Sequence, residues 1–227
     1  SISDFTSYLT EKFPNPCGQC YHARMRIISL QSGSNGNCIY VEAAGVKMLF
    51  DAGISGKNAQ HRLAGAGGDI CDVDALIISH DHRDHVASAG IFQRKFGHKM
   101  YITRHTLAAA SCRCPLGKLV DICHFNAGDS FTVGDAVIHT IPTPHDAADG
   151  CGFVVEAEGK RLGILTDLGH VFSGLSDVIE SLDALFLESN YDPDMLERGP
   201  YPPYLKRRIR GDAGHLSNEE SAALVLA

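Results

Sequence analysis

Short runs of apolar and β-branched residues recur along the chain and are separated by turns or by helical stretches. Runs of this length between turn residues predict strands. The predicted strands cover residues 26–30, 38–42, 46–50, 75–79, 136–141, 152–156, 162–166 and 184–187. The predicted helices cover residues 57–66, 86–96, 103–110, 175–182 and 217–226. Strands and helices mixed in this way predict an α/β fold in which helices cover the sheets.

Short sequence motifs add detail to the predicted elements near the start and the end of the chain. Glycine turns at residues 32–37 and 43–45 lie between the first predicted strands and indicate antiparallel hairpins. Ser217 and Glu220 have the spacing of a capping box at the start of the last helix. Residues 1–24 are polar, contain proline and show no clear period, so we expect an extension that is disordered or lies outside the folded unit. Residues 25–227 are then the folded domain.

Composition narrows the class of protein. The chain has 227 residues, 44% of them hydrophobic and 21% charged, as in an ordinary globular protein. Its formal net charge of -7 argues against binding to nucleic acid by bulk positive field, although a local basic patch or bound cations can reverse the sign. No apolar run reaches the ~18 residues of a membrane helix. The N-terminal sequence also lacks the apolar core of a signal peptide, so we expect reduced cysteines and a cytoplasmic location.

Twelve histidines are the unusual feature, because histidine is the commonest metal ligand. Three of them lie in residues 79–85, directly after an apolar strand, in the sequence Ser-His-Asp-His-Arg-Asp-His. His80 and His82 are two residues apart in an extended segment and can share one metal ion. Asp84 and His85 begin the following helix and can reach a second cation. We therefore predict a metal site at this strand end.

Three single residues fit the same site. His145 follows one predicted strand and Asp167 ends another, and strand ends converge in space, so both are candidate ligands. Asp51 closes the strand at residues 46–50 and is a candidate to accept a hydrogen bond from a ligating imidazole, which would fix its tautomer.

These residues resemble the metallo-β-lactamase-fold hydrolases. The resemblance rests on His-x-His-x-Asp-His at residues 80–85, on the preceding Phe-Asp-Ala-Gly at 50–53, and on the later His145 and Asp167. The match is closest to the YycJ/WalJ-like group. It is carried there by Ser-Gly-Ser-Asn-Gly-Asn at residues 32–37, Pro-His-Asp-Ala at 144–147, Thr-Asp-Leu-Gly at 166–169, Glu-Ser-Asn-Tyr-Asp at 188–192 and Gly-His-Leu-Ser-Asn at 214–218.

The resemblance implies an αββα four-layer sandwich, two divalent metal ions and nuclease activity that releases nucleotides from DNA ends. By motif, His80, His82 and His145 would bind one metal, Asp84 and His85 the other, and Asp167 would bridge them. The metals would be zinc or manganese, with iron also suited to the carboxylate bridge, and Asp84 could also orient the attacking water. Similarity to tRNase Z-like enzymes makes His215 the candidate proton donor to the leaving group, with Glu188 positioning it. A helix-flanking role for His215 stays open.

The resemblance also concerns the end of the domain. In the fold that it implies, the last helix leads into one more strand, whose final histidine completes the second metal site. Here the sequence ends within that helix, so we expect a C-terminally incomplete domain and a weakly bound second metal.

Substrate is less constrained than chemistry, because this fold serves many reactions. Residues 201–210 place Lys206, Arg207, Arg208 and Arg210 beside two tyrosines, and such a segment can track phosphates and stack bases. It can equally be a solvated basic face. We favour a phosphodiesterase acting on DNA. A small-molecule thioester or lactone hydrolase and a non-catalytic metal-binding domain are the alternatives, and the oligomeric state is open.

Overall fold

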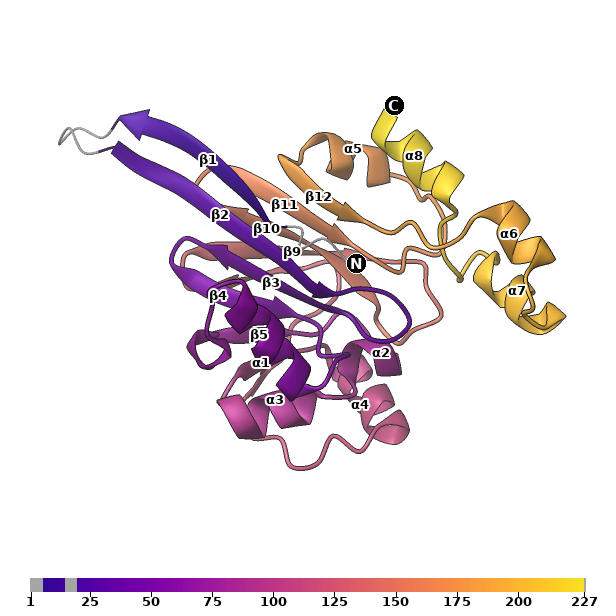
Figure 1. Cartoon of the computed structure of the whole chain (residues 1–227), viewed down its shortest axis with the longest axis horizontal. Helices are drawn as coiled ribbons and strands as arrows, with labels where there is room; N and C mark the ends of the chain where they lie inside the picture. The colour runs from indigo at the N-terminus through magenta and orange to yellow at the C-terminus, as the bar shows by residue number, and fades with distance from the viewer. Residues whose placement is uncertain (1–5, 15–19, 227) are drawn as a thin grey trace.

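Two β-sheets form the centre of the molecule (Figure 1). The computed structural model describes residues 6–14 and 20–226, with side chains from Met25 onward. The first sheet has the order β1-β2-β3-β4-β5-β6-β7 and the second has the order β12-β11-β10-β9-β8. The strands of the first sheet are β1 Thr6–Pro14, β2 Cys20–Gln31, β3 Cys38–Ala43, β4 Val46–Phe50, β5 Ala75–Ile77, β6 Lys99–Tyr101 and β7 Ile122–Cys123. Those of the second are β8 Ser130–Val133, β9 Ala136–Pro142, β10 Cys151–Ala157, β11 Lys160–Leu165 and β12 Ala184–Leu187.

Helices lie on the outer face of each sheet (Figure 1). Those on the first sheet are α1 Gly56–Gly65, α2 Arg83–Val86, α3 Ala89–Phe96 and α4 Arg104–Arg113, with a short 3-10 turn at Ile70–Asp72. In the second half of the chain, α5 Leu175–Glu180 and α8 Asn218–Leu226 cover the second sheet, whereas α6 Pro193–Arg198 and α7 Pro203–Ile209 extend beyond its edge (Figure 1). Within residues 6–14 and 20–226, no helix combines the length and apolar character needed to cross a membrane.

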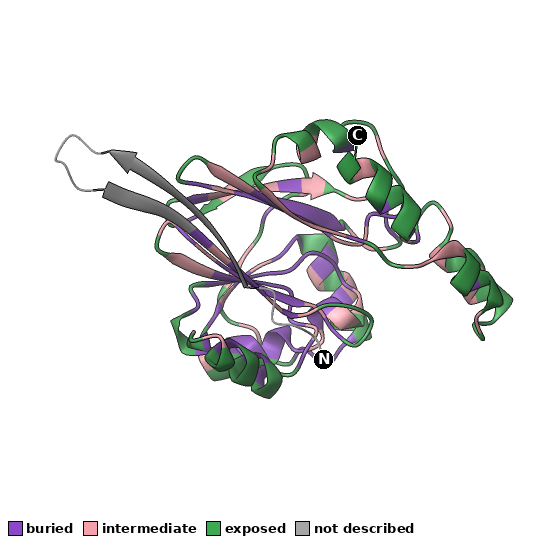
Figure 2. Ribbon diagram, turned by 45° about the horizontal axis from the view of Figure 1, so that its top comes forward, coloured by how far each residue is buried: buried purple, intermediate pink, exposed green. Residues whose placement is uncertain are grey.

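The alternation of side chains along the strands produces three apolar clusters. Figure 2 shows buried residues along the strands of both sheets. Ile28, Tyr40 and Leu49 point outward and contact residues of α1 to α4. Their neighbours on the same strands point inward, where Phe50 contacts Phe153 of the second sheet with ring centroids 5.2 Å apart. The outer face of the second sheet and helices α5 and α8 form a smaller cluster, whose buried members are Leu165, Leu168, Leu175 and Leu216. The order helix, sheet, sheet, helix is the αββα sandwich that the resemblance implied.

Most of the predicted elements are present, with shifted ends. β2, β3 and β4 pair antiparallel, as the glycine turns predicted. The capping box is also formed, because Ser217 Oγ accepts from Glu220 N at 3.2 Å while the Glu220 carboxylate accepts from Ser217 N at 2.8 Å. β2 begins at Cys20 and pairs with β1, five residues before the expected start of the folded unit. Residues 1–5 and 15–19 of the predicted extension lie outside the described residues.

The helix predicted over residues 86–96 corresponds to α3 but starts later, because a short separate helix, α2, precedes it. α2 ends at Val86 and α3 begins at Ala89. Ala52 explains the break, because its backbone N–H donates to His85 O at 2.7 Å and its carbonyl accepts from Ser88 N at 2.9 Å. These two bonds tie the end of α2 and the start of α3 to the residue pair that follows β4, and so hold His85 beside Asp51.

Candidate metal centre

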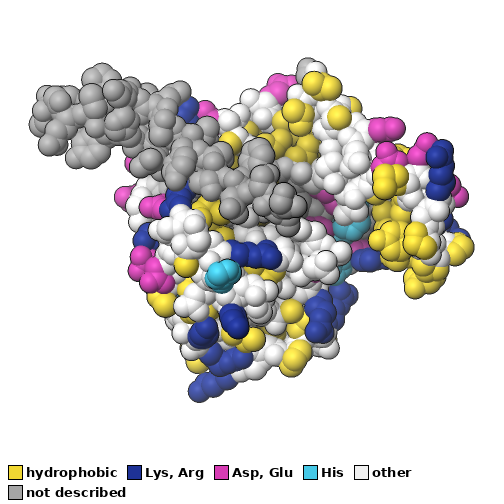
Figure 3. Space-filling view, viewed as in Figure 1, with side chains coloured by type: hydrophobic (Ala, Val, Ile, Leu, Met, Phe, Trp, Pro, Cys, Tyr) yellow, Lys and Arg dark blue, Asp and Glu magenta, His cyan; other side chains and the backbone are white. Residues whose placement is uncertain are grey.

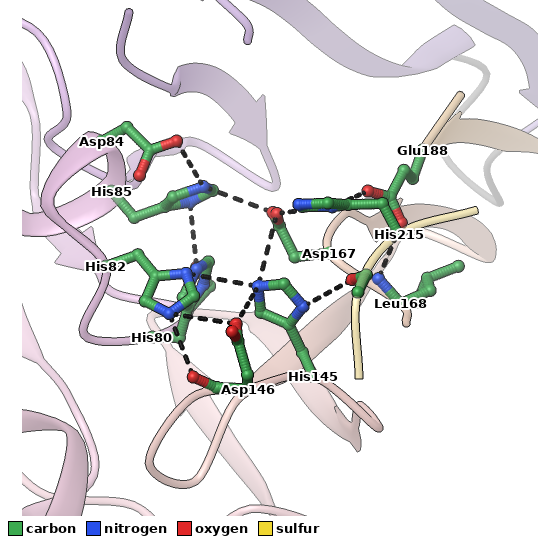
Figure 4. Close-up of polar contacts among 12 residues, drawn as sticks. His80, His82, Asp84, His85, His145, Asp146, Asp167, Leu168, Glu188 and His215 are labelled. Carbon is green, nitrogen blue, oxygen red and sulfur yellow. Dashed lines mark hydrogen bonds and ion pairs between the residues drawn. The ribbon is translucent and has the colours of Figure 1, made fainter. Parts of the chain in front are cut away.

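The predicted ligands meet at one edge of the sandwich, where loops from both sheets converge (Figure 4). The first sheet supplies the segment after β5, and the second supplies the loops after β9, β11 and β12. Three overlapping groups of potential ligands have their donor atoms within 4.8 Å of one another. They are His80, His82 and His145; His80, His85 and Asp167; and His145, Asp167 and His215.

The first group presents three imidazole lone pairs to one point. His145 Nδ1 donates to Gly214 O at 2.8 Å, which leaves its Nε2 as an acceptor. His82 Nε2 lies 3.1 Å from Asp146 O, and a proton there leaves Nδ1 as the acceptor. His82 Nδ1 and His145 Nε2 are then 3.2 Å apart with lone pairs facing each other, an arrangement that a cation stabilises.

His80 completes this group and supplies the most direct sign of a metal. Its Nε2 is buried and has no hydrogen-bond partner among the described residues. Burial, together with the neighbouring imidazoles, holds the pKa of His80 well below its ordinary value, so the ring is neutral. A neutral, buried, unpartnered imidazole nitrogen is suited to a metal ion, and the residues present therefore fit one.

Asp51 organises both His80 and His85. His85 Nδ1 donates to Asp51 Oδ2 at 2.7 Å, and His80 Nδ1 lies 2.9 Å from Ser79 Oγ, which itself lies 2.9 Å from the Asp51 carboxylate. One buried carboxylate thus orients one imidazole directly and the other through a hydroxyl. Asp51 has a φ of +66°, a conformation that non-glycine residues rarely adopt, and its surroundings hold it there.

The second group has a more acidic environment. His85 Nε2 lies 3.3 Å from Asp167 Oδ2 and 3.7 Å from Asp84 Oδ2. Burial would lower the pKa of His85, but the carboxylates of Asp51, Asp167 and Asp84 outweigh it and raise the pKa to about 9. The pocket therefore favours positive charge beside His85, which a divalent cation also supplies. Asp84 lies at the rim of this group and is outside the three groups defined above.

His215 forms a short pair with Glu188. His215 Nδ1 lies 2.5 Å from Glu188 Oε1 and 3.5 Å from Asp167 Oδ1. The Glu188 carboxylate is buried and also accepts from the backbone N–H groups of Leu168 and Leu216 at 2.8 and 3.2 Å. Burial would lower the pKa of His215, but the hydrogen bond and charge of Glu188 raise it. The pair can therefore hold a proton next to the ligand cluster.

A cleft of about 760 Å³ opens onto this cluster. Asp84, Asp167 and His215 line its inner end, and Arg208 is the member of the predicted basic segment that lines it. Arg208 donates to both oxygens of Asp146, from Nε at 2.7 Å and from Nη2 at 3.0 Å. Lys206 and Arg210 instead contact Glu197 of α6.

Comparison with known proteins agrees with this geometry. A family model described as "Beta-lactamase superfamily domain" matches residues 47–227. The exodeoxyribonuclease WalJ of Streptococcus pneumoniae serotype 2 is 36% identical over 200 residues, which cover 87% of this chain and 74% of the relative. The exodeoxyribonuclease YycJ of Bacillus anthracis is 35% identical over 198 residues, which cover 87% of this chain and 75% of the relative. The chain belongs to the β-lactamase superfamily, in its WalJ/YycJ-like group.

Solved structures of other proteins share the fold at low sequence identity. The metallo-β-lactamase-fold protein YhfI from Bacillus subtilis has a TM-score of 0.65 at 16% identity, covering 88% of this chain and 80% of that one. Zinc-bound PqqB from Methylobacterium extorquens has a TM-score of 0.64 at 19% identity, covering 84% and 72%. These likenesses confirm the predicted architecture.

Three polar residues around the candidate metal centre were not predicted from the sequence. Asp81 is fully buried between the ligand histidines; its Oδ1 accepts from Ala148 N at 2.8 Å and its Oδ2 lies 2.7 Å from Arg113 Nη1. It therefore joins the loop of His80 to the loop of His145. Asn37 Nδ2 lies 2.9 Å from His85 Nε2, and Asp146 Oδ1 lies 3.3 Å from His82 Nε2. The sequence did contain a signal for these residues, because all three lie inside the motifs at residues 32–37, 80–85 and 144–147.

We expect Gly53→Ala to disturb the site more than the rest of the fold. A Cβ at Gly53 would lie 1.6 Å from Asp84 O and 2.5 Å from Asn37 N, so the segment that carries Asp84 must move. We expect a loss of about 1–3 kcal/mol in the free energy of unfolding, as for other overpacked sites, and a reduced metal content. Chemical denaturation and elemental analysis measure the two effects.

Gly65→Ala is the matched control, because Gly65 ends α1 and a Cβ there meets nothing within 4 Å. This change should leave metal content unaltered. Normal metal content in Gly53→Ala would contradict the close approach as a determinant of the site.

Proposed function

We propose that the chain is a metal-dependent exonuclease that releases nucleotides from DNA ends. The observation that carries this proposal is its 35–36% identity to two relatives named exodeoxyribonucleases, over 87% of the chain. The geometry of the cleft supports it, because two carboxylates of the candidate metal centre, an arginine and the partly buried His215–Glu188 pair line one space. These are the parts that hydrolysis of a phosphodiester requires: charge neutralisation, an activated water and a proton for the leaving oxygen.

His80, His82 and His145 would hold one divalent cation, and His85 and Asp84 a second, with Asp167 between them. Such cations lower the pKa of water and neutralise charge on phosphate oxygens. Zinc and manganese both suit this mixture of imidazole and carboxylate ligands. Asp51 keeps the donor nitrogens of His80 and His85 aimed at the cluster through the hydrogen bonds described above.

His215 would supply the proton. Its Nδ1–H is held by Glu188, so its second proton lies on Nε2, and the raised pKa favours retention of that proton. Nε2 would donate to the oxygen that leaves when the phosphodiester bond breaks. Glu188 acts through His215 and is a positioning residue.

One assay tests the proposal. The purified chain, supplied with Zn²⁺ or Mn²⁺, is given end-labelled single- and double-stranded DNA and RNA, and a generic thioester in parallel. We expect stepwise release of nucleotides from DNA ends and no comparable thioester hydrolysis. Hydrolysis of the thioester with intact DNA would overturn the proposal and favour the small-molecule hydrolase.

A variant of Arg208 tests whether the basic segment at residues 201–210 binds phosphate or is a solvated basic face. We expect Arg208→Gln to raise KM for DNA about ten-fold and to reduce the salt dependence of binding by about one phosphate contact, since Arg208 lines the cleft. Arg207→Gln is the control, because Arg207 is exposed on the same helix and is not among the cleft residues described above. The measurement is KM across a salt series, with metal content checked in both variants. Equal behaviour of the two variants would assign the basic segment to solvent.

A further inference from the structure

The outer part of the cleft differs chemically from the part near the ligands. One wall is the turn between β2 and β3, which contributes Ser32, Gly33, Ser34 and Asn37. The opposite wall is formed by α6 and α7 and by the segment between them, which contribute Leu196, Tyr201, Leu205, Arg208 and Ile209. Figure 3 shows this hollow between the main body and the two helices, with histidine at its inner end.

One face of α7 points toward the cleft. Leu205, Arg208 and Ile209 are three and four residues apart, so they share the face toward the cleft. Arg208 is the single lysine or arginine among the described residues that line the cleft. Positive charge therefore lies at the inner end of this wall, beside Asp146, whereas the outer end of the wall is apolar and aromatic. A phosphate fits the inner end and an uncharged, flat group fits the outer end.

Tyr201 is the aromatic residue of this outer wall and is held on a stiff segment. It lies between Pro200 and Pro202, and Pro203 begins α7. Proline fixes its own φ and restricts the residue before it, so the backbone of Tyr201 has little freedom to lose when a ligand binds. Its side chain is 52% exposed although it lines the cleft. An exposed ring on a rigid backbone is suited to stacking.

We propose that Tyr201 is a stacking subsite for an unpaired base, so that the preferred substrate is a nucleic-acid end with unpaired nucleotides. This inference rests on the proposed function. A cleft of about 760 Å³ is of the size that holds a small ligand such as a terminal nucleotide. The base lies on Tyr201 with Leu205 beside it, and its phosphate lies toward Arg208 and the ligand cluster. Stacking of an aromatic side chain is sequence-tolerant, because every base has a π face.

The test combines variants of Tyr201 with substrates that lack one base. Tyr201→Leu keeps apolar volume without a π face, Tyr201→Phe keeps the face, and Tyr204→Leu is the control on an exposed tyrosine outside the cleft lining. Each is assayed on single-stranded DNA and on the same strand with an abasic nucleotide at successive positions near the end. Metal content and circular dichroism are measured for every variant.

We expect Tyr201→Leu to raise KM for single-stranded ends about ten-fold, within the range of one stacked base, with kcat changed less than about two-fold. At one position, loss of the base should raise KM for the wild-type chain and not for Tyr201→Leu. Tyr201→Phe and Tyr204→Leu should behave as wild type. Equal effects of the abasic position in wild type and Tyr201→Leu would overturn the stacking subsite and leave the exonuclease proposal intact. Failure of the wild-type chain to cleave any end would overturn the proposed function, and the subsite with it.

Discussion

Alanine at His80 should remove most of the bound metal. His80 belongs to two of the three ligand groups, and its Nε2 has no other partner in the described chain, so its loss affects both cation positions. We expect metal affinity to fall by more than about 100-fold, which exceeds the usual effect of losing a hydrogen bond to a ligand. His82→Ala, in one group only, should lose most of one ion per chain. Elemental analysis of protein loaded with Zn²⁺ or Mn²⁺ and then gel-filtered measures both.

His61→Ala is the control for these variants, because His61 is exposed on α1 and distant from the cluster in sequence and in the fold. It should retain the metal content of the wild-type chain. Full retention of metal by His80→Ala would remove the basis for the site as assigned.

His215→Ala should lower the rate of DNA cleavage by about 10²–10⁴-fold, the usual contribution of a general acid. The loss should depend on the leaving group. A phosphodiester with a p-nitrophenolate leaving group needs no proton, so we expect its hydrolysis to fall less than about ten-fold. Glu188→Gln, which disturbs only the position and charge of the imidazole, should lie between wild type and His215→Ala on DNA. Single-turnover rates on the two substrates provide the measurement.

Metal content decides between proton donor and ligand in this experiment. His215 also lies in a potential ligand group with His145 and Asp167. If His215→Ala lost metal and slowed both substrates equally, the residue would be a ligand instead of an acid. His170→Ala is a suitable control, because His170 is an exposed histidine near the same loop. Its Nδ1 lies 2.6 Å from Asp212 O, in the loop that carries His215.

Much of the site could be predicted because its ligands follow strands. His80, His82 and His85 are close in sequence, and strand topology alone brings His145 and Asp167 to the same edge. The direction of a side chain within a loop was harder to predict. Asp84, predicted to bind the second metal together with His85, has its Oδ2 3.7 Å from His85 Nε2 and belongs to none of the three ligand groups of the described residues.

The α6 and α7 helices show why the cleft was less predictable. Both are short, and the prolines and charges of residues 201–210 resemble an irregular basic segment more than a helix. Without the helical period, nothing in the sequence distinguishes one of the four cations from the others. In the helix, the spacing of residues places Arg208 on the face toward the cleft. Lys206 and Arg210 contact Glu197 instead and so connect α7 to α6.

The metal centre draws its candidate ligands from loops of both sheets, so metal binding is coupled to the packing of the two sheets. His80, His82 and His85 follow a strand of the first sheet, whereas His145 and Asp167 follow strands of the second and His215 lies between α7 and α8. In an unfolded chain, bringing these two sets together costs the entropy of closing a long loop, whereas the assembled sandwich already holds them at one edge. A bound metal ion would contact residues from both sheets, and its binding energy would therefore oppose separation of the sheets.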